Sequence, residues 1–139
     1  MGFFTLEAAR LVGPKGRVVA VDIQSKMIEV LRRRAQRAGL LDRLDTRLIK
    51  DNGLGIKDLK GKVDFVLAFA MVHEVPDADK FFLETATALK PGGRMLFAEP
   101  SGHVSEEHFA RLIAQAQEAG LRRESLPVIR WSRSALLVK

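Results

Sequence analysis

The chain has 139 residues, 47% of them hydrophobic and 29% charged, with no cysteine and a formal net charge of +6. This composition is typical of one folded domain, which we expect to span 1–139, and it excludes disulfides, thiolate metal sites and cysteine nucleophiles. No apolar run approaches the ~20 residues that cross a bilayer, and no secretion signal is visible. We therefore expect a cytoplasmic protein that does not bind membranes.

Helix and strand patterns alternate along the chain. Caps and breakers set several boundaries: Ser25 and Asp77 are predicted N-caps, Gly39 and Gly120 end helices, and Pro91-Gly92-Gly93 stops the helix that reaches Lys90. In chain order, the patterns predict a helix at 4–11, a strand at 17–21, a helix at 26–38, strands at 45–50 and 62–70, a helix at 77–90, a strand at 94–99, a helix at 105–120 and two strands within 122–139.

This alternation predicts an open α/β sheet with helices on both faces. The segment 62–70 is almost entirely apolar, which is typical of a strand buried on both faces of a parallel sheet. Ligands of such sheets bind beyond the carboxyl ends of the strands. The loops expected there begin at Asp22, Asp51, Ala70 and Glu99.

Three of these four loops carry an acid at or just past the strand end, namely Asp22, Asp51 and Glu99. A carboxylate in that place can accept hydrogen bonds from a ribose diol or from the amino group of adenine. Each acid alone fits equally well as a solvated turn residue or a helix cap. The three together favour a ligand that contains a nucleoside.

The positive charge raises the question of nucleic-acid binding. The densest run, Arg32-Arg33-Arg34 with Arg37, lies off the apolar stripe of its predicted helix and near the C-terminal end, where the helix dipole favours cations. No aromatic residue is interleaved for base stacking. We therefore interpret the run as a solvated helix face, with a nucleic-acid surface as the less favoured alternative.

Two long segments resemble the class I S-adenosylmethionine-dependent methyltransferases. GFFTLEAARLVGPKGRVVAVDIQSKMIEVLRRRA is similar to the stretch that follows the glycine-rich motif of that family, and VDFVLAFAMVHEVPDADKFFLETATALKPGGRMLFAEP to its fourth strand, next helix and fifth strand. The resemblance implies a Rossmann-like fold with a mostly parallel sheet and an antiparallel C-terminal strand. The family's first strand and most of its glycine-rich turn have no counterpart here, and Gly2 matches the last glycine of that turn. The resemblance therefore implies an N-terminally truncated domain.

In the family, the strand without a counterpart lies at the centre of the sheet, between the strands that match 17–21 and 62–70. Three arrangements would deal with the gap. The natural protein is longer, the two strands pair directly, or a second copy covers the open edges. We expect a homodimer.

The resemblance also implies roles for individual residues. The implied cofactor is S-adenosylmethionine, and Gly2 belongs to the turn around its methionine part. The other implied contacts are Asp22 to the ribose hydroxyls, Ile23 to one face of the adenine, Asp51 and Asn52 to the adenine amino group and its surroundings, and the backbone of Ala70 and Met71 to the methionine part.

His73 and Glu74 are the pair for which we predict a catalytic role, because their loop would face a methyl acceptor. Methyl transfer depends mostly on positioning, and a histidine can also remove a proton from the acceptor. The alternative is structural, with His73 hydrogen-bonding the loop and Glu74 solvated. His103 and His108 are five positions apart, a poor spacing for a shared metal, and no metal is predicted.

Two classes of function follow. The first is a methyltransferase that acts on an unidentified, small-molecule methyl acceptor. The second is an inactive methyltransferase-like relic or binding module. A nicotinamide-dependent enzyme is a weaker third interpretation, because Asp22 would also suit the ribose of a dinucleotide.

Overall fold

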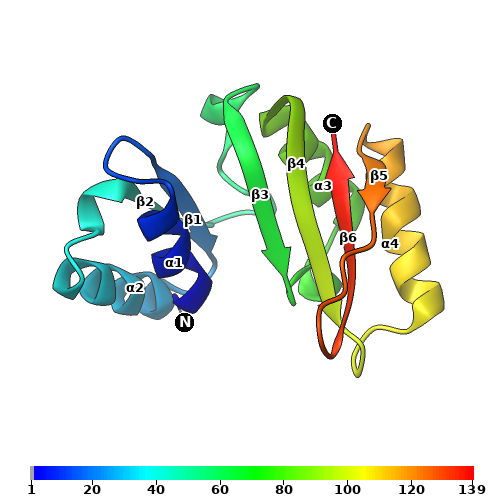
Figure 1. Ribbon diagram of the computed structural model, residues 1–139, viewed down its shortest axis with the longest axis horizontal. Helices are drawn as coiled ribbons and strands as arrows, with labels where there is room; N and C mark the ends of the chain where they lie inside the picture. The colour runs from blue at the N-terminus through cyan, green and yellow to red at the C-terminus, as the bar shows by residue number, and fades with distance from the viewer. Residues whose placement is uncertain (1) are drawn as a thin grey trace. The chain divides into compact units, whose positions relative to one another are not determined.

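The computed structural model describes residues 2–139, which fold into two compact units (Figure 1). One unit ends at Gly55 and the other runs from Ile56 to Lys139. Both units contain helices and strands, so the predicted α/β class is confirmed. One domain over 1–139 remains a prediction. Among residues 2–139, no helix is long and apolar enough to cross a membrane.

The first unit pairs two parallel strands with two helices. The strands are in register from Val18 opposite Leu44 to Asp22 opposite Leu48. Helix α2 buries Leu31 and Ala35, which lie one turn apart on one face. The elements are α1 (Phe3–Leu11), β1 (Val18–Asp22), α2 (Ser25–Arg37), the short 3₁₀ helix η1 (Leu41–Arg43) and β2 (Leu44–Leu48).

The start of α2 differs from the prediction. Ser25 is already the first helical residue, and the N-cap is Gln24, whose side chain makes no cap hydrogen bond. Instead, the Gln24 N–H donates to Asp22 Oδ1 at 2.8 Å, so the carboxylate at the end of β1 holds the entry to the helix. The other end of α2 follows the prediction, because Gly39 has a φ of 70° just after the C-cap, a conformation that favours glycine.

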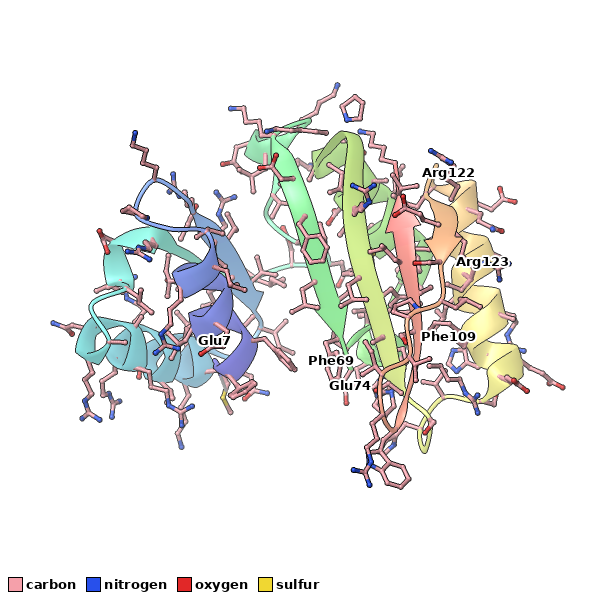
Figure 2. All side chains as sticks on the ribbon, viewed as in Figure 1. Glu7, Phe69, Glu74, Phe109, Arg122 and Arg123 are labelled. Atoms are coloured by element: carbon pink, nitrogen blue, oxygen red, sulfur yellow. The ribbon has the colours of Figure 1, made fainter. Side chains whose placement is uncertain are left out.

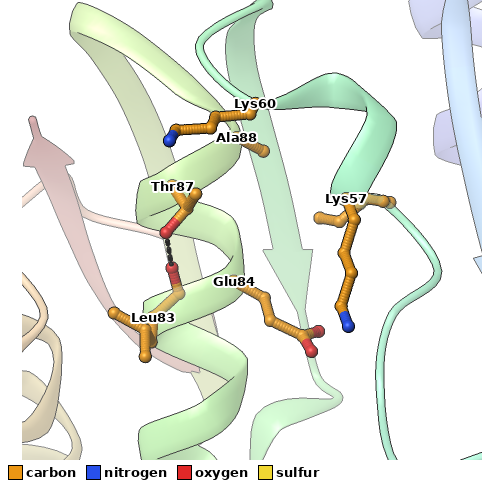
Figure 3. Close-up of a pocket in the computed structure, with 7 residues that line it drawn as sticks. Lys57, Lys60, Leu83, Glu84, Thr87 and Ala88 are labelled. Atoms are coloured by element: carbon orange, nitrogen blue, oxygen red, sulfur yellow. Dashed lines mark hydrogen bonds between the residues drawn. The ribbon is translucent and has the colours of Figure 1, made fainter.

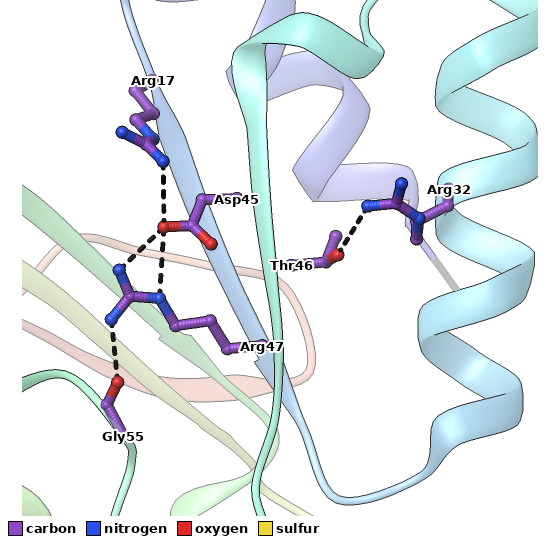
Figure 4. A network of polar contacts seen from close by, with 6 residues as sticks. All are labelled: Arg17, Arg32, Asp45, Thr46, Arg47 and Gly55. Carbon is purple, nitrogen blue, oxygen red and sulfur yellow. Dashed lines mark hydrogen bonds and ion pairs between the residues drawn. The ribbon is translucent and has the colours of Figure 1, made fainter.

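A polar network joins the two strands of this unit (Figure 4). Asp45 Oδ2 accepts hydrogen bonds from Arg47 Nη2 at 2.7 Å and from Arg17 Nη2 at 3.2 Å. Arg47 Nη1 also donates to the carbonyl of Gly55 at 2.8 Å. Arg32, from the arginine run on α2, donates to Thr46 Oγ1 at 3.2 Å. At least one arginine of that run is therefore bound to the neighbouring strand.

The second unit is built on a four-stranded sheet in the order β3–β4–β6–β5. β3 and β4 are parallel, whereas β6 is antiparallel to both of its neighbours, as expected for the C-terminal strand. The elements are η2 (Lys57–Leu59), β3 (Val63–Phe69), η3 (Val72–Glu74), α3 (Ala78–Ala88), β4 (Leu89–Pro100), α4 (Glu106–Glu118), β5 (Arg122–Ser125) and β6 (Ser132–Val138).

Helices α3 and α4 lie on the same face of this sheet (Figure 1). Their contact with it is aromatic: the Phe97 ring lies 5.5 Å from that of Phe82 and 5.0 Å from that of Phe109, centroid to centroid. Asp77 is confirmed as an N-cap, and Ser105, the predicted start of the other helix, is the N-cap there. Asp77 Oδ1 accepts from the Lys80 N–H at 3.0 Å, and Ser105 Oγ accepts from the His108 N–H at 3.1 Å.

Two predictions about this sheet are wrong. The Pro91-Gly92-Gly93 segment does not end a helix, because α3 stops at Ala88 and the segment belongs to β4, where the register with β3 shifts. The segment 62–70 is not buried on both faces, since Phe65 is 52% exposed and Leu67 is exposed on the same face. The physical reason is that β3 is an edge strand of this sheet and that α3 and α4, the helices of the same unit, both lie on one face of the sheet.

The pairing of β1 and β3 is relevant to the family strand that has no counterpart in this chain. Among residues 2–139, β1 pairs with β2 alone and β3 pairs with β4 alone. Direct pairing of 17–21 with 62–70, one of the three arrangements considered, remains an expectation. The homodimer remains a prediction.

Candidate functional site

The backbone is unusual where β3 ends. Ala70 has a φ of 56°, a left-handed conformation that costs a residue with a Cβ about 1–2 kcal/mol. Its N–H donates to the carbonyl of Ala98 on β4 at 2.8 Å, so the pairing of the two strands holds this conformation. Strained positions of this kind concentrate at functional sites. Ala70 and Met71, which we expect to contact the cofactor, thus lie at a turn with a left-handed residue. Their role remains a prediction.

A buried carboxylate lies beside this turn. Glu99, near the end of β4, is 0% exposed. Its Oε1 accepts a hydrogen bond from the Val72 N–H at 2.8 Å, and its Oε2 is hydrogen-bonded to Nδ1 of His73. Both oxygens are therefore used within the loop that follows β3.

The two residues predicted to be catalytic lie next to each other on η3 but differ in their surroundings. The His73 side chain is 17% exposed, and that of Glu74 is 76% exposed. Glu74 Oε1 lies 3.7 Å from His73 Nε2, the ring nitrogen that does not contact Glu99. Figure 2 places Glu74 and Phe69 together at the carboxyl end of β3. The His103 ring, from the loop after β4, stacks on that of His73, with centroids 5.9 Å apart.

The close partner of His73 is therefore Glu99, which the sequence identified only as an acid at a strand end. Treating His73 and Glu74 as the one pair able to do chemistry was incomplete. A signal was available: in a parallel pair of strands, an acid that ends one strand lies beside the loop that follows the other. Because the two residues are 26 positions apart in the sequence, local sequence patterns do not reveal the contact.

In the first unit, the two predicted acids lie at the same edge of their sheet. Asp22 ends β1, and its carbonyl accepts from the Ile49 N–H at 2.8 Å, so β2 ends beside it. Asp51 follows two residues later, and its Oδ1 accepts from the Gly53 N–H at 3.0 Å. Ile23 is 71% exposed, and Asn52 is exposed next to Asp51.

Gly2 lies at the N-cap of α1 with a φ of 89°. A Cβ at this position would lie 2.9 Å from Leu31 Cδ1, so both the backbone conformation and the packing against α2 require glycine. This agrees with its match to a glycine of the family's turn. The contact with a cofactor remains a prediction.

The hydrogen-bond acceptors of this unit suit an adenosine group. Among the described hydrogen bonds, Asp22 and Asp51 each use only Oδ1, which leaves acceptor capacity on the second oxygen for hydroxyl or amino donors. Ile23, which directly follows Asp22, has an exposed side chain that offers an apolar surface. These three residues would hold the nucleoside part of S-adenosylmethionine.

Comparison with known proteins identifies the family. Residues 1–128 match the family model described as a methyltransferase domain. The chain belongs to this methyltransferase family. The resemblance to class I S-adenosylmethionine-dependent methyltransferases is thereby confirmed, and it favours a methyltransferase over a nicotinamide-dependent enzyme.

Curated relatives are longer than this chain. The ubiquinone/menaquinone biosynthesis C-methyltransferase UbiE of Pasteurella multocida is 32% identical over 98 residues, which are 70% of this chain and 36% of the relative. Demethylmenaquinone methyltransferase of Lactococcus lactis is 26% identical over 100 residues, or 72% of this chain and 38% of the relative. The matched part thus amounts to little more than a third of these relatives.

Solved structures show the same fold. A SAM-dependent methyltransferase from Aquifex aeolicus has a TM-score of 0.84 at 20% identity, covering 99% of this chain and 76% of that one. Geranyl diphosphate C-methyltransferase from Streptomyces coelicolor, solved with Mg²⁺, geranyl diphosphate and S-adenosyl-L-homocysteine, has a TM-score of 0.72 at 16% identity, covering 99% and 66%. The predicted Rossmann-like methyltransferase fold is confirmed.

A cavity lies away from the carboxyl ends of the strands. It has a volume of about 210 Å³ and lies between η2 and α3, at the opposite end of β3 (Figure 3). Its lining consists of Ile56, Lys57, Lys60, Leu83, Glu84, Thr87 and Ala88. None of the predicted site residues is among them. Within residues 2–139, no group of three or more histidine or acidic residues could hold a metal ion.

Proposed function

We propose that this chain is part of an S-adenosylmethionine-dependent methyltransferase that acts on a small-molecule acceptor. The observation that carries the proposal is the pair Asp22 and Asp51, which lie at one sheet edge of a chain that belongs to the methyltransferase family. In open α/β sheets, this edge is where nucleotide ligands bind.

We assign the following roles to individual residues. Asp22 accepts hydrogen bonds from the ribose hydroxyls, Asp51 accepts from the adenine amino group, and Ile23 packs against the adenine ring. When bound, the cofactor supplies a methyl group activated on a sulfonium. His73 and Glu74 lie beyond the carboxyl end of β3, where they bind and orient the acceptor and receive its proton.

For the acceptor, a carbon atom of a small organic molecule is the first class to test. Two kinds of observation support it. The relative UbiE is named as a C-methyltransferase, and so is one structural neighbour, geranyl diphosphate C-methyltransferase. Loss of a C–H proton needs a base, and an imidazole is suited to that task at neutral pH.

We also propose that the protein is a cytoplasmic homodimer. The unpaired edge of β3 and the exposed Phe65 and Leu67 beside it support the dimer, because open apolar edges recruit partners. Light scattering coupled to gel filtration measures its mass. A monomer at all accessible concentrations contradicts the dimer without affecting the proposed activity.

Calorimetric titration with S-adenosylhomocysteine tests the proposed function. The wild-type chain should bind with micromolar affinity, and Asp22→Ala should weaken binding at least about tenfold, because it removes hydrogen bonds to a charged acceptor. Asp42→Ala is the matched control, since Asp42 is exposed on η1, before the amino end of β2 and away from the carboxyl ends of the strands, and should bind like the wild type. Absence of binding by the wild type contradicts the proposal and favours the relic or binding module.

A further inference from the structure

Among residues 2–139, Glu99 is the one ionisable side chain that is fully buried. A carboxylate in such surroundings is costly unless hydrogen bonds replace its water. Glu99 has two partners, the Val72 N–H on Oε1 and His73 Nδ1 on Oε2. The first bond fixes the start of η3, and the second fixes the imidazole that η3 carries.

The pairing determines which ring nitrogen of His73 carries a proton. His73 Nδ1 is hydrogen-bonded to Glu99 Oε2. When Glu99 is ionised, its carboxylate only accepts hydrogen bonds, so Nδ1 is then the nitrogen that donates its N–H. In the neutral ring, Nε2 is then the unprotonated nitrogen. Nε2 is on the side of the ring away from Glu99, 3.7 Å from the exposed carboxylate of Glu74.

We propose that Glu99 is a positioning residue that holds His73 in the Nδ1–H tautomer, so that Nε2 is the base for the methyl acceptor. This inference rests on the proposed function. The acceptor gives its proton to Nε2, and its electron pair forms the bond to the methyl carbon, while the electrons of the broken carbon–sulfur bond remain on sulfur. The positive charge on the ring then faces Glu99 on one side and Glu74 on the other.

The surrounding groups support this arrangement. The His103 ring stacks on that of His73 with an angle of 16° between the planes, which limits tilting of the ring. Glu74 is the exposed acid nearest to Nε2, so it can pass the proton on to solvent. Glu99, Glu74 and His103 are the titratable groups that the structure places around the imidazole.

A purely structural role for Glu99 makes a different prediction. To hold η3, one oxygen on the Val72 N–H is enough, and the amide oxygen of a glutamine would serve equally well. In Glu99→Gln, that oxygen stays on the Val72 N–H, and the amide NH₂ faces His73 Nδ1. Nδ1 must then accept, which moves the proton of the neutral ring to Nε2.

Long-range ¹H–¹⁵N spectra of protein labelled with ¹⁵N-histidine test the proposal, at an alkaline pH at which the rings are neutral. His103→Gln and His108→Gln assign the signals. We expect Nδ1–H for His73 in the wild type and Nε2–H in Glu99→Gln, with Glu74→Gln unchanged. A wild-type Nε2–H tautomer, or the same tautomer in wild type and Glu99→Gln, overturns the proposal. If Glu99→Gln does not fold, the wild-type spectrum decides alone.

A second measurement separates this proposal from the proposed function. S-adenosylhomocysteine should bind Glu99→Gln within about twofold of the wild type, because Glu99 is not among the nucleoside contacts. With an acceptor in hand, kcat should fall about 100-fold or more with little change in KM, the usual contribution of a general base. An unchanged kcat overturns the positioning role. Failure of the wild type to bind the cofactor product refutes the proposed function and leaves the tautomer result standing.

Discussion

The two ends of β3 and β4 both carry pairs of charged side chains, but the pairs are built differently. At the carboxyl end, Glu99 is completely buried against His73. At the amino end, Lys90 and Asp64 pair at 2.8 Å with side chains that are 49% and 81% exposed. An exposed pair costs little and contributes about 0–1 kcal/mol, whereas a buried carboxylate must be fully compensated. The buried pair at the carboxyl end therefore depends on its hydrogen bonds far more than the exposed pair at the amino end does.

The backbone repeats this contrast. The tight segment at the amino end is made of Gly92, with a φ of 80°, and Gly93, which are the residues such geometry requires. At the carboxyl end, a comparable left-handed position is occupied by Ala70. Departures from local rules are expected where a site needs a particular geometry. Substitutions at the two ends, and one on β5 beside β4 residue Arg94, test this comparison.

Glu99→Ala should have the largest effect. It leaves the Val72 N–H and the His73 ring without their buried partner, which should lower the free energy of unfolding by about 3 kcal/mol. Urea denaturation measures the change. Asp64→Ala at the amino end is the matched control and should cost less than about 1 kcal/mol. Equal losses in the two variants would show that the ends do not differ.

Gly93→Ala should be the costliest simple change at the amino end. The added Cβ would lie 2.9 Å from the carbonyl oxygen of Lys90 and 3.0 Å from Leu89 Cδ2, so backbone must move. We expect a loss of about 2 kcal/mol, in the range for overpacking. Binding of S-adenosylhomocysteine should be unchanged, because the substitution lies away from the carboxyl ends. Loss of that binding in a folded variant would argue against the division of roles.

Ala70→Gly should stabilise the protein. Glycine accepts the φ of 56° without the penalty of a Cβ, and after the larger entropy of the unfolded chain the net gain should be about 0.5–1 kcal/mol. The same urea measurement detects it. A destabilised Ala70→Gly variant would mean that the methyl group, rather than the backbone geometry, is what the turn requires.

Glu124 should give the smallest effect, and one that depends on pH. Arg94 donates hydrogen bonds of 2.8 and 3.0 Å to this carboxylate and lowers its pKa. The stabilisation is complete above the ordinary value of 4.5 and is lost as the pH falls through the lower pKa of the folded state. Melting temperatures of wild type and Glu124→Gln should therefore differ at neutral pH and converge in acid. A gap that widens in acid would contradict this sign.

The sequence predicted what local chemistry decides. Asp77 caps its helix as expected, and the predicted helix start at Ser105 is also right, because a cap involves only the next three residues. At α2, Ser25 does not cap the helix as expected, and Asp22 instead accepts a hydrogen bond from the N–H of the N-cap residue Gln24. The apolar run at 62–70 predicted the strand but not its exposure, because burial depends on neighbouring elements.

The candidate site was predictable to a similar extent. The acids at strand ends could be found from chain order, and Asp22 and Asp51 do lie at one edge. The bond between His73 and Glu99 could not be predicted from composition, because it depends on the register of β3 and β4. The conformation of Ala70 has no sequence signal, since alanine is common at ordinary positions.

The most direct test of the account is a ¹H–¹⁵N titration of the labelled chain with S-adenosylhomocysteine. We expect shifts of the amides at the carboxyl ends of the strands, with Ile23, Asn52, Ala70 and Met71 among the largest, and none at Gly93 or along the cavity beside Thr87. Shifts confined to the amino end or the cavity, or no shifts at millimolar ligand, would contradict it.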